Sequence, residues 1–226
     1  MLVLAAHAGA GASVVSVLIG DAAAASGAPS RLIECADPVR SGVAAATDAE
    51  LGTDPSGWRC GRRGLLDVDR PADPVFSAGD VAAPRGHQRG PDDASRLTVV
   101  DAGWPAWDVI AGSGWVSELA RTAPVVLVVR LTVPGVRQAE QLLAALPTSP
   151  LIAAVGPAKW PGAVAASCGP RMRAARGDDR VVAVPFDRAL DVTGLTPGPL
   201  PTSLQAAGRS LATHLYADRT GIPPRG

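Results

Sequence analysis

The chain has 226 residues, of which 47% are hydrophobic and 19% charged, so it has enough apolar side chains to form a core. Its formal net charge is zero, which excludes a protein that nucleic acid or an anionic membrane attracts as a whole. Its three cysteines form no CxxC pair and predict neither a disulfide framework nor a zinc site. We therefore expect a globular cytoplasmic protein with no transmembrane segment and no direct contact with nucleic acid.

The N-terminal segment has the pattern of a strand, a glycine-rich turn and a helix. Residues 1–6 are an aliphatic run, Gly9 and Gly11 follow, and a helix is predicted over 13–26 with Ser13 as its capping residue. Glycines allow successive backbone N–H groups to face an anion, and the positive end of a helix dipole favours negative charge. The segment is therefore a candidate phosphate-binding loop, although it contains no lysine.

A second aliphatic run at 31–35 precedes a long stretch rich in glycine, proline, aspartate and arginine. Residues 36–95 are predicted to be an irregular insert with small elements of its own, because structureless loops of that length are rare inside compact domains. We expect a helix near 41–50 and a short hairpin at 57–70. Residues 78–93 are the best candidate for a mobile loop.

A third aliphatic strand, predicted over 96–102, contains Asp101 near its end. Trp104, Trp107 and Trp115 follow it closely. If the first two lie on a helix, they share one face, and clustered aromatic side chains are favoured at binding hot spots. Core packing is the commoner role of large aromatic residues, so the three tryptophans are candidates for a protein-binding surface beside that plainer alternative.

The remainder of the chain continues the alternation of strands and helices. Strands are predicted at 123–131, 150–155 and 180–186, and helices at 134–147 and 203–216, the last with Ser203 as its cap. Runs that are apolar on both faces are typical of buried parallel strands. Residues 1–226 therefore predict a single α/β domain with a mostly parallel central sheet, helices on both faces and three layers, α/β/α.

The loop resembles the deviant Walker A motif of the ParA/MinD family of P-loop ATPases, which reads K-G-G-x-G-K-[ST]. Laid on that motif, the chain reads His7-Ala8-Gly9-Ala10-Gly11-Ala12-Ser13. Both lysines of the motif are missing, because His7 and Ala12 stand in their places. The resemblance implies a P-loop-like fold and a nucleotide loop formed by Gly9, Ala10, Gly11, Ala12 and Ser13.

Two acidic segments extend the resemblance. Glu34 and Asp37-Pro38 are similar to the family's D-x-D-P segment with one residue inserted, and Asp101 stands where the family has its Walker B carboxylate. By resemblance, Asp37 belongs to the nucleotide site, and Ser13 and Asp101 hold the Mg²⁺ of a bound ATP or ADP.

The missing lysine at Ala12 bears on catalysis. A fixed cation beside the transferred phosphoryl group contributes much of the rate acceleration in such reactions. We therefore expect a degenerate ParA/MinD-like protein, a pseudo-ATPase that acts as a scaffold or localisation factor in plasmid partition, cell division, or pilus, secretion or conjugation machinery. By resemblance, it has a protein partner, forms a homodimer across the nucleotide face, and is recruited to a membrane-associated complex.

One alternative is a nucleotide-switched ATPase that binds ATP and Mg²⁺ through the loop backbone, Ser13 and Asp101. It would need an arginine from elsewhere in the chain, for which Arg62, Arg63 and Arg130 are candidates.

A second alternative is an NAD(P)-binding Rossmann oxidoreductase. Gly9 and Gly11 would begin a dinucleotide fingerprint, and Glu34 would bind the ribose. Val14 replaces the third glycine of that fingerprint, and the sequence has no Tyr-x-x-x-Lys pair.

Overall fold

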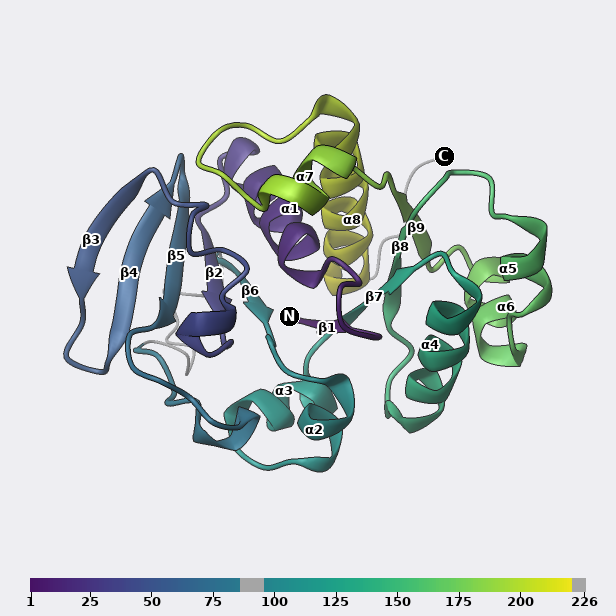
Figure 1. Cartoon of the computed structure of the whole chain (residues 1–226), viewed down its shortest axis with the longest axis horizontal. Helices are drawn as coiled ribbons and strands as arrows, with labels where there is room; N and C mark the ends of the chain where they lie inside the picture. The colour runs from purple at the N-terminus through teal and green to yellow at the C-terminus, as the bar shows by residue number, and fades with distance from the viewer. Residues whose placement is uncertain (86–95, 221–226) are drawn as a thin grey trace.

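The structure is a computed structural model that describes residues 1–85 and 96–220, including the side chains of 1–85 and 96–215. The strands of the described residues form one nine-stranded sheet in the order β3-β4-β5-β2-β6-β1-β7-β8-β9 (Figure 1). All neighbouring pairs from β5 to β9 are parallel, and only β3/β4 and β4/β5 are antiparallel. The strands are β1 (Leu2–Ala5), β2 (Ser30–Glu34), β3 (Ala49–Thr53), β4 (Trp58–Arg63), β5 (Leu66–Pro71), β6 (Leu97–Asp101), β7 (Val125–Arg130), β8 (Leu151–Val155) and β9 (Val181–Val184).

Helices cover both faces of the sheet, which gives three layers and confirms the predicted α/β/α fold class (Figure 1). On one face lie α1 (Ala12–Ala25), α7 (Arg188–Thr193) and α8 (Thr202–Thr220). On the other lie α2 (Ala106–Ala111), α3 (Trp115–Thr122), α4 (Val133–Ala145), α5 (Gly162–Ala166) and α6 (Pro170–Gly177). Successive side chains of a strand point to opposite faces, so Val3 packs in the first layer while Leu2 and Leu4 pack in the second.

The order of the strands reverses at β1, which lies between β6 and β7. From β1 the chain passes through α1 to β2 on the β6 side, whereas β6 leads through α2 and α3 to β7 on the opposite side. In open parallel sheets, ligands bind in the crevice that such a reversal leaves at the carboxyl ends of the strands. The glycine-rich turn follows the carboxyl end of β1 and therefore lies at this crevice.

The aliphatic runs all form the predicted strands, and the three helices predicted outside the insert are present as α1, α4 and α8. The predicted caps were wrong. Gly11 is the N-cap residue of α1 and Ser13 lies inside its first turn, while Ser203 is the second residue of α8. In α4, Thr132 caps the helix by accepting a hydrogen bond from the N–H of Gly135 at 3.1 Å.

The helix expected near 41–50 was wrong. A short 3₁₀ helix, η1 (Pro38–Arg40), is followed by turns and then by β3. The backbone groups that a helix would pair internally are bonded to side chains instead: the carbonyls of Ala44 and Ala46 accept hydrogen bonds from the guanidinium groups of Arg70 and Arg63.

The rest of the insert contains regular structure. Strands β4 and β5 form an antiparallel hairpin where residues 57–70 predict one, and β3 adds a third strand at the sheet edge. Within the segment predicted to be mobile, η2 (Ala78–Asp80) is a 3₁₀ helix, and 86–93 lie outside the described residues. None of the described helices is both long enough and apolar enough to cross a membrane.

Candidate functional site

A cavity of about 590 Å³ opens at the point where the strand order reverses. Residues 5–14 form one wall, and residues at or after the ends of β2 and β6 form the other, including Ala36, Arg40, Asp101 and Trp104. The predicted loop residues Gly9, Ala10, Gly11, Ala12 and Ser13 therefore all line this space, which we call the loop cavity.

The backbone of the loop leaves its N–H groups free to bind an anion. Gly9 and Gly11 have φ angles of 72° and 98°, a region that glycine enters without strain. Helix α1 has no side-chain cap and no acidic residue in its first turn. The N–H groups of Gly11, Ala12, Ser13 and Val14 have no acceptor within the part of the chain that the structure describes. The wall thus combines unpaired donors with the positive end of the helix dipole.

Asp101 lies at the bottom of the loop cavity and is only 1% exposed. Its Oδ1 accepts a hydrogen bond from the N–H of Gly103 at 3.3 Å, whereas its Oδ2 has no partner among the described residues. Burial raises the pKa of this carboxyl, while the N–H of Gly103 and the hydroxyl of Ser13 lower it; the Ser13 hydroxyl lies near the carboxylate but makes no hydrogen bond to Oδ2. A buried carboxylate oxygen without a partner fits a cation or a metal-bound water as its missing ligand.

Glu34 is the register partner of Asp101 on the adjacent strand, but it does not line the loop cavity. Its Oε1 accepts hydrogen bonds from the N–H groups of Gly42 at 2.7 Å and Val43 at 3.3 Å, and its Oε2 accepts one from the hydroxyl of Ser41. Burial and the nearby charge of Asp101 raise the pKa of Glu34 to about 7, although these three hydrogen bonds oppose the shift. The Rossmann interpretation thereby loses its ribose-binding residue, because this carboxylate is enclosed by its own chain.

The two positions that lack lysine differ in their surroundings. His7 is part of the framework: its Nε2 accepts a hydrogen bond from the N–H of Arg130 at 3.3 Å, and its Nδ1–H donates to the carbonyl of Ala8 at 2.9 Å. Ala12 is the first residue of α1 and faces the loop cavity. A side chain at position 12 would therefore point at whatever the loop binds.

The predicted site residue Asp37 is not among the residues that line the loop cavity. Its carboxylate instead accepts hydrogen bonds from the N–H groups of Val39 and Val75, at 3.0 and 2.8 Å.

Of the tryptophans, Trp104 and Trp107 line the loop cavity, whereas Trp115, at the start of α3, donates to the carbonyl of Val81. The predicted shared helix face was wrong, because Trp104 precedes α2 and lies in the turn after β6.

Arg40 lines the loop cavity, and sequence reasoning missed it. Its guanidinium lies 4.3 Å from the centre of the Trp104 ring. It stands three residues after Asp37, in a segment already expected at the nucleotide site, and that position was the available signal. The candidate cations Arg62 and Arg63 are instead paired with Asp67 and Asp21 away from the cavity.

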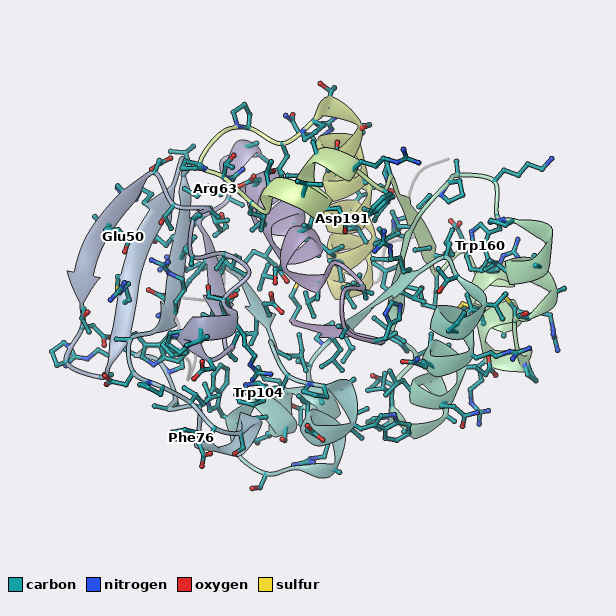
Figure 2. The ribbon with its side chains drawn as sticks, in the orientation of Figure 1. Glu50, Arg63, Phe76, Trp104, Trp160 and Asp191 are labelled. Carbon is teal, nitrogen blue, oxygen red and sulfur yellow. The ribbon has the colours of Figure 1, made fainter. Side chains whose placement is uncertain are left out.

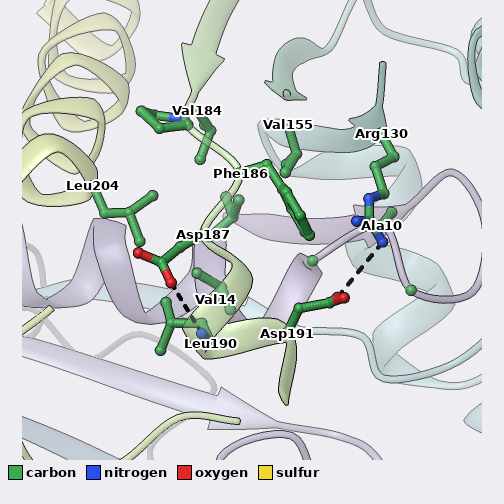
Figure 3. A pocket seen from close by; sticks show the side chains of 14 residues that line it. Ala10, Val14, Arg130, Val155, Val184, Phe186, Asp187, Leu190, Asp191 and Leu204 are labelled. Carbon is green, nitrogen blue, oxygen red and sulfur yellow. Dashed lines mark hydrogen bonds and ion pairs between the residues drawn. The ribbon is translucent and has the colours of Figure 1, made fainter. Parts of the chain in front are cut away.

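A second cavity of about 220 Å³ adjoins the other side of the loop and shares Gly9, Ala10, Gly11 and Val14 with the first. Its wall is largely apolar and includes Val14, Val155, Val184, Phe186 and Leu204. Figure 3 shows the guanidinium of Arg130 beside the ring of Phe186, 4.0 Å from its centre, and directed at Asp191, whose Oδ1 is 3.6 Å from Nη1.

Comparison with known proteins finds likeness in structure only. No family model matches the sequence, and no curated protein matches it. A chain of the MinC:MinD cell division protein complex of Aquifex aeolicus superposes with a TM-score of 0.65 at 15% identity, covering 100% of this chain and 97% of that one.

Two further structures agree with this likeness. A Borrelia burgdorferi protein assigned to plasmid partition and bound to AMPPNP has a TM-score of 0.55 at 9% identity, over 96% and 97% of the two chains. A ParA family ATPase of Chlorobium tepidum has 0.52 at 12% identity, over 95% and 99%. The chain therefore has the ParA/MinD-type fold that its loop motif predicts.

Proposed function

We propose that this chain is a catalytically degenerate protein of ParA/MinD-type fold that serves as a scaffold or localisation factor in a larger assembly. The observation that carries the proposal is the composition of the loop cavity, which keeps the glycine turn and Asp101 but has Ala12 where the motif has its phosphate lysine. Without that cation, the negative charge of a transferring phosphoryl group is left poorly stabilised.

A phosphate-release assay with Mg²⁺ and ATP tests the loss of catalysis. We expect the wild-type chain to release phosphate no faster than the Asp101→Asn variant, because no turnover depends on the site. Turnover that falls in Asp101→Asn and in Ser13→Ala would contradict the proposal, since both side chains would then be supporting a reaction.

The partner of such a scaffold is a protein, and the face that carries the loop cavity is the proposed contact. Val39 is 92%, Phe76 85% and Trp107 51% exposed. Asp37 joins the first two segments, because it accepts hydrogen bonds from the N–H groups of Val39 and of Val75, the neighbour of Phe76. Exposed apolar side chains gathered near one site favour a protein interface. The similarity to a chain of the MinC:MinD complex supports a protein partner. We propose that the same face serves in a homodimer.

Sedimentation equilibrium at micromolar concentrations tests self-association. Val39→Asp is expected to abolish a dimer formed across this face. Leu65→Asp is the control and is expected to leave the dimer intact: Leu65 is also exposed, at 76%, but lies on the turn between β4 and β5 and does not line the loop cavity. Equal dimerisation of the two variants would place the interface elsewhere.

A second candidate function, a nucleotide-switched protein, is favoured by a separate observation. The first N–H groups of α1 and Oδ2 of Asp101 have no partners in the described part of the chain, and an apolar cavity adjoins the loop. These groups fit a nucleotide phosphate, a hydrated Mg²⁺ and an adenine ring, respectively. Ser13 and Asp101 would hold the Mg²⁺, which would neutralise phosphate charge.

Isothermal titration with ATP and ADP in the presence of Mg²⁺ tests this second function. Binding in the micromolar range that weakens in Ser13→Ala and Asp101→Asn would support it. Binding that neither substitution changes would contradict the assignment of the metal ligands, and no heat up to millimolar nucleotide would leave the scaffold function alone.

A further inference from the structure

The loop cavity attracts an anion but has little positive charge inside it. Four backbone N–H groups and the start of a 14-residue helix form one wall. Asp101, whose buried Oδ2 has no partner among the described residues, lines the same space and repels an anion that arrives without a cation. A phosphate group held here therefore needs a positive side chain as well as the loop.

Arg40 is the only arginine or lysine among the described residues that line the loop cavity. It has no carboxylate partner in the described part of the chain, because each ion pair found there belongs to an arginine other than Arg40 or to a histidine. Its side chain is exposed at the mouth of the cavity, so its charge is available to a ligand.

The guanidinium of Arg40 lies over the ring of Trp104, which supports it. The indole Nε1–H donates to the carbonyl of Cys35 at 2.7 Å, which anchors the ring between the end of β2 and the turn before α2 (Figure 2). The guanidinium lies 4.3 Å from the ring centre. Stacking occupies one face of the guanidinium and leaves its in-plane N–H donors for a phosphate, which arginine binds in a bidentate manner.

The other candidate arginines are occupied. Arg63 is 4% exposed and bonds to Asp21 and to backbone carbonyls. Arg130 faces the second cavity, where it meets Asp191. Arg62 pairs with an aspartate on the hairpin.

We infer that Arg40, stacked on Trp104, supplies the positive charge of the loop cavity in place of the missing lysine, and that its ligand is a polyphosphate group chelating a divalent cation. The loop N–H groups hold the phosphate, Arg40 contacts it from the opposite wall, and Asp101 faces the cation. The inference rests on the second candidate function, nucleotide binding, and is independent of the scaffold role.

Isothermal titration of the full chain with Mg²⁺ and ATP, ADP or pyrophosphate tests the assignment. Arg40→Gln is expected to weaken binding of each probe about tenfold or more, as the loss of a charged bidentate contact does. Arg40→Lys should fall between, because it keeps the charge and loses the planar fork. Arg137→Gln is the matched control: it removes the same charge from an exposed site next to the cavity-lining Gln138 and should bind like wild type.

The outcomes distinguish the role of Arg40 from the nucleotide binding on which it rests. If wild type binds nucleotide and Arg40→Gln binds it equally well, the role of Arg40 is overturned while nucleotide binding stands. If wild type binds none of the three probes at millimolar concentration, both fall. Pyrophosphate binding as tight as that of ATP, and equally sensitive to Arg40→Gln, would assign recognition to the phosphates, whereas binding of ATP and ADP alone would show that the nucleoside is needed as well.

Discussion

At the scale of single residues, Glu34 is a buried acid whose protonation contributes to stability. Its pKa in the folded protein is about 7, against 4.5 for an ordinary glutamate, so the folded state holds the proton more tightly than the unfolded state. The contribution of Glu34 to the free energy of unfolding should therefore be greatest below pH 4.5 and fall as the pH rises through 7, by about 3 kcal/mol in total. Urea unfolding at pH 5 and pH 8 measures most of this change.

Glu34→Gln isolates the contribution of that carboxyl, because the remaining acids are present in both proteins. The loss of stability between pH 5 and pH 8 should be about 2 kcal/mol smaller in the variant. Asp101 keeps a slope of the same sign, since burial raises the pKa of its carboxyl too. An identical pH dependence in the two proteins would mean that Glu34 is ionised throughout.

At the scale of elements, Arg63 joins parts of the chain that are distant in sequence. From the end of β4 its guanidinium reaches Asp21 on α1 at 3.0 Å, and the carbonyls of Thr196 and Gly198 at 2.5 and 2.8 Å (Figure 2). Thr196 and Gly198 follow closely after Leu195, which lines the loop cavity. The hairpin thus holds one rim of the candidate site in place.

Arg63→Ala is expected to lower the free energy of unfolding by about 3 kcal/mol, because it leaves the buried carbonyl of Ala46 and the carboxylate of Asp21 without their partner. Arg62→Ala is the control, since that neighbouring side chain is 52% exposed and pairs with Asp67 at 3.4 Å. It should cost less than about 1 kcal/mol. Equal losses in urea unfolding would show that the Arg63 contacts do not support the fold.

The elements that the sequence predicted well are those with a strong local signal. The strands predicted from aliphatic runs are largely apolar because helices cover both faces of the sheet there, and α4 carries a proline in its first turn. The error at 41–50 had a non-local cause: Glu34, Arg63 and Arg70 bind the backbone there, and their distance in sequence hides this. Edge strand β3, with all of its residues exposed, has no apolar pattern to detect.

At the scale of the whole molecule, the candidate site was predictable where one motif supplies it and not where the fold assembles it. Gly9, Gly11 and Asp101 follow recognisable strands, so their meeting at the sheet edge follows from topology. Arg40 lines the same cavity as the last residue of η1, with its guanidinium over the ring of Trp104. No spacing rule in the sequence encodes that pairing.

The likeness of the whole fold to ParA and MinD proteins makes restoring the lysine a test of the loop's geometry. Ala12→Lys places a cation at the positive end of α1, so without ligand the variant should lose about 0.5 kcal/mol of stability. With Mg²⁺ and ATP it should bind at least about tenfold more tightly than wild type, and binding raises the free energy of unfolding with ligand concentration. The sign of the stability difference should therefore reverse when nucleotide is added.

Urea unfolding with and without nucleotide measures both signs, and Ala25→Lys provides the matched control. It introduces the same side chain at the exposed opposite end of α1, where a cation suits the dipole and lies away from the loop cavity. Nucleotide should stabilise Ala25→Lys no more than wild type. If Ala12→Lys also gains nothing from nucleotide, position 12 does not face a bound phosphate. The scaffold function proposed for this chain would then not depend on a phosphate bound beside position 12.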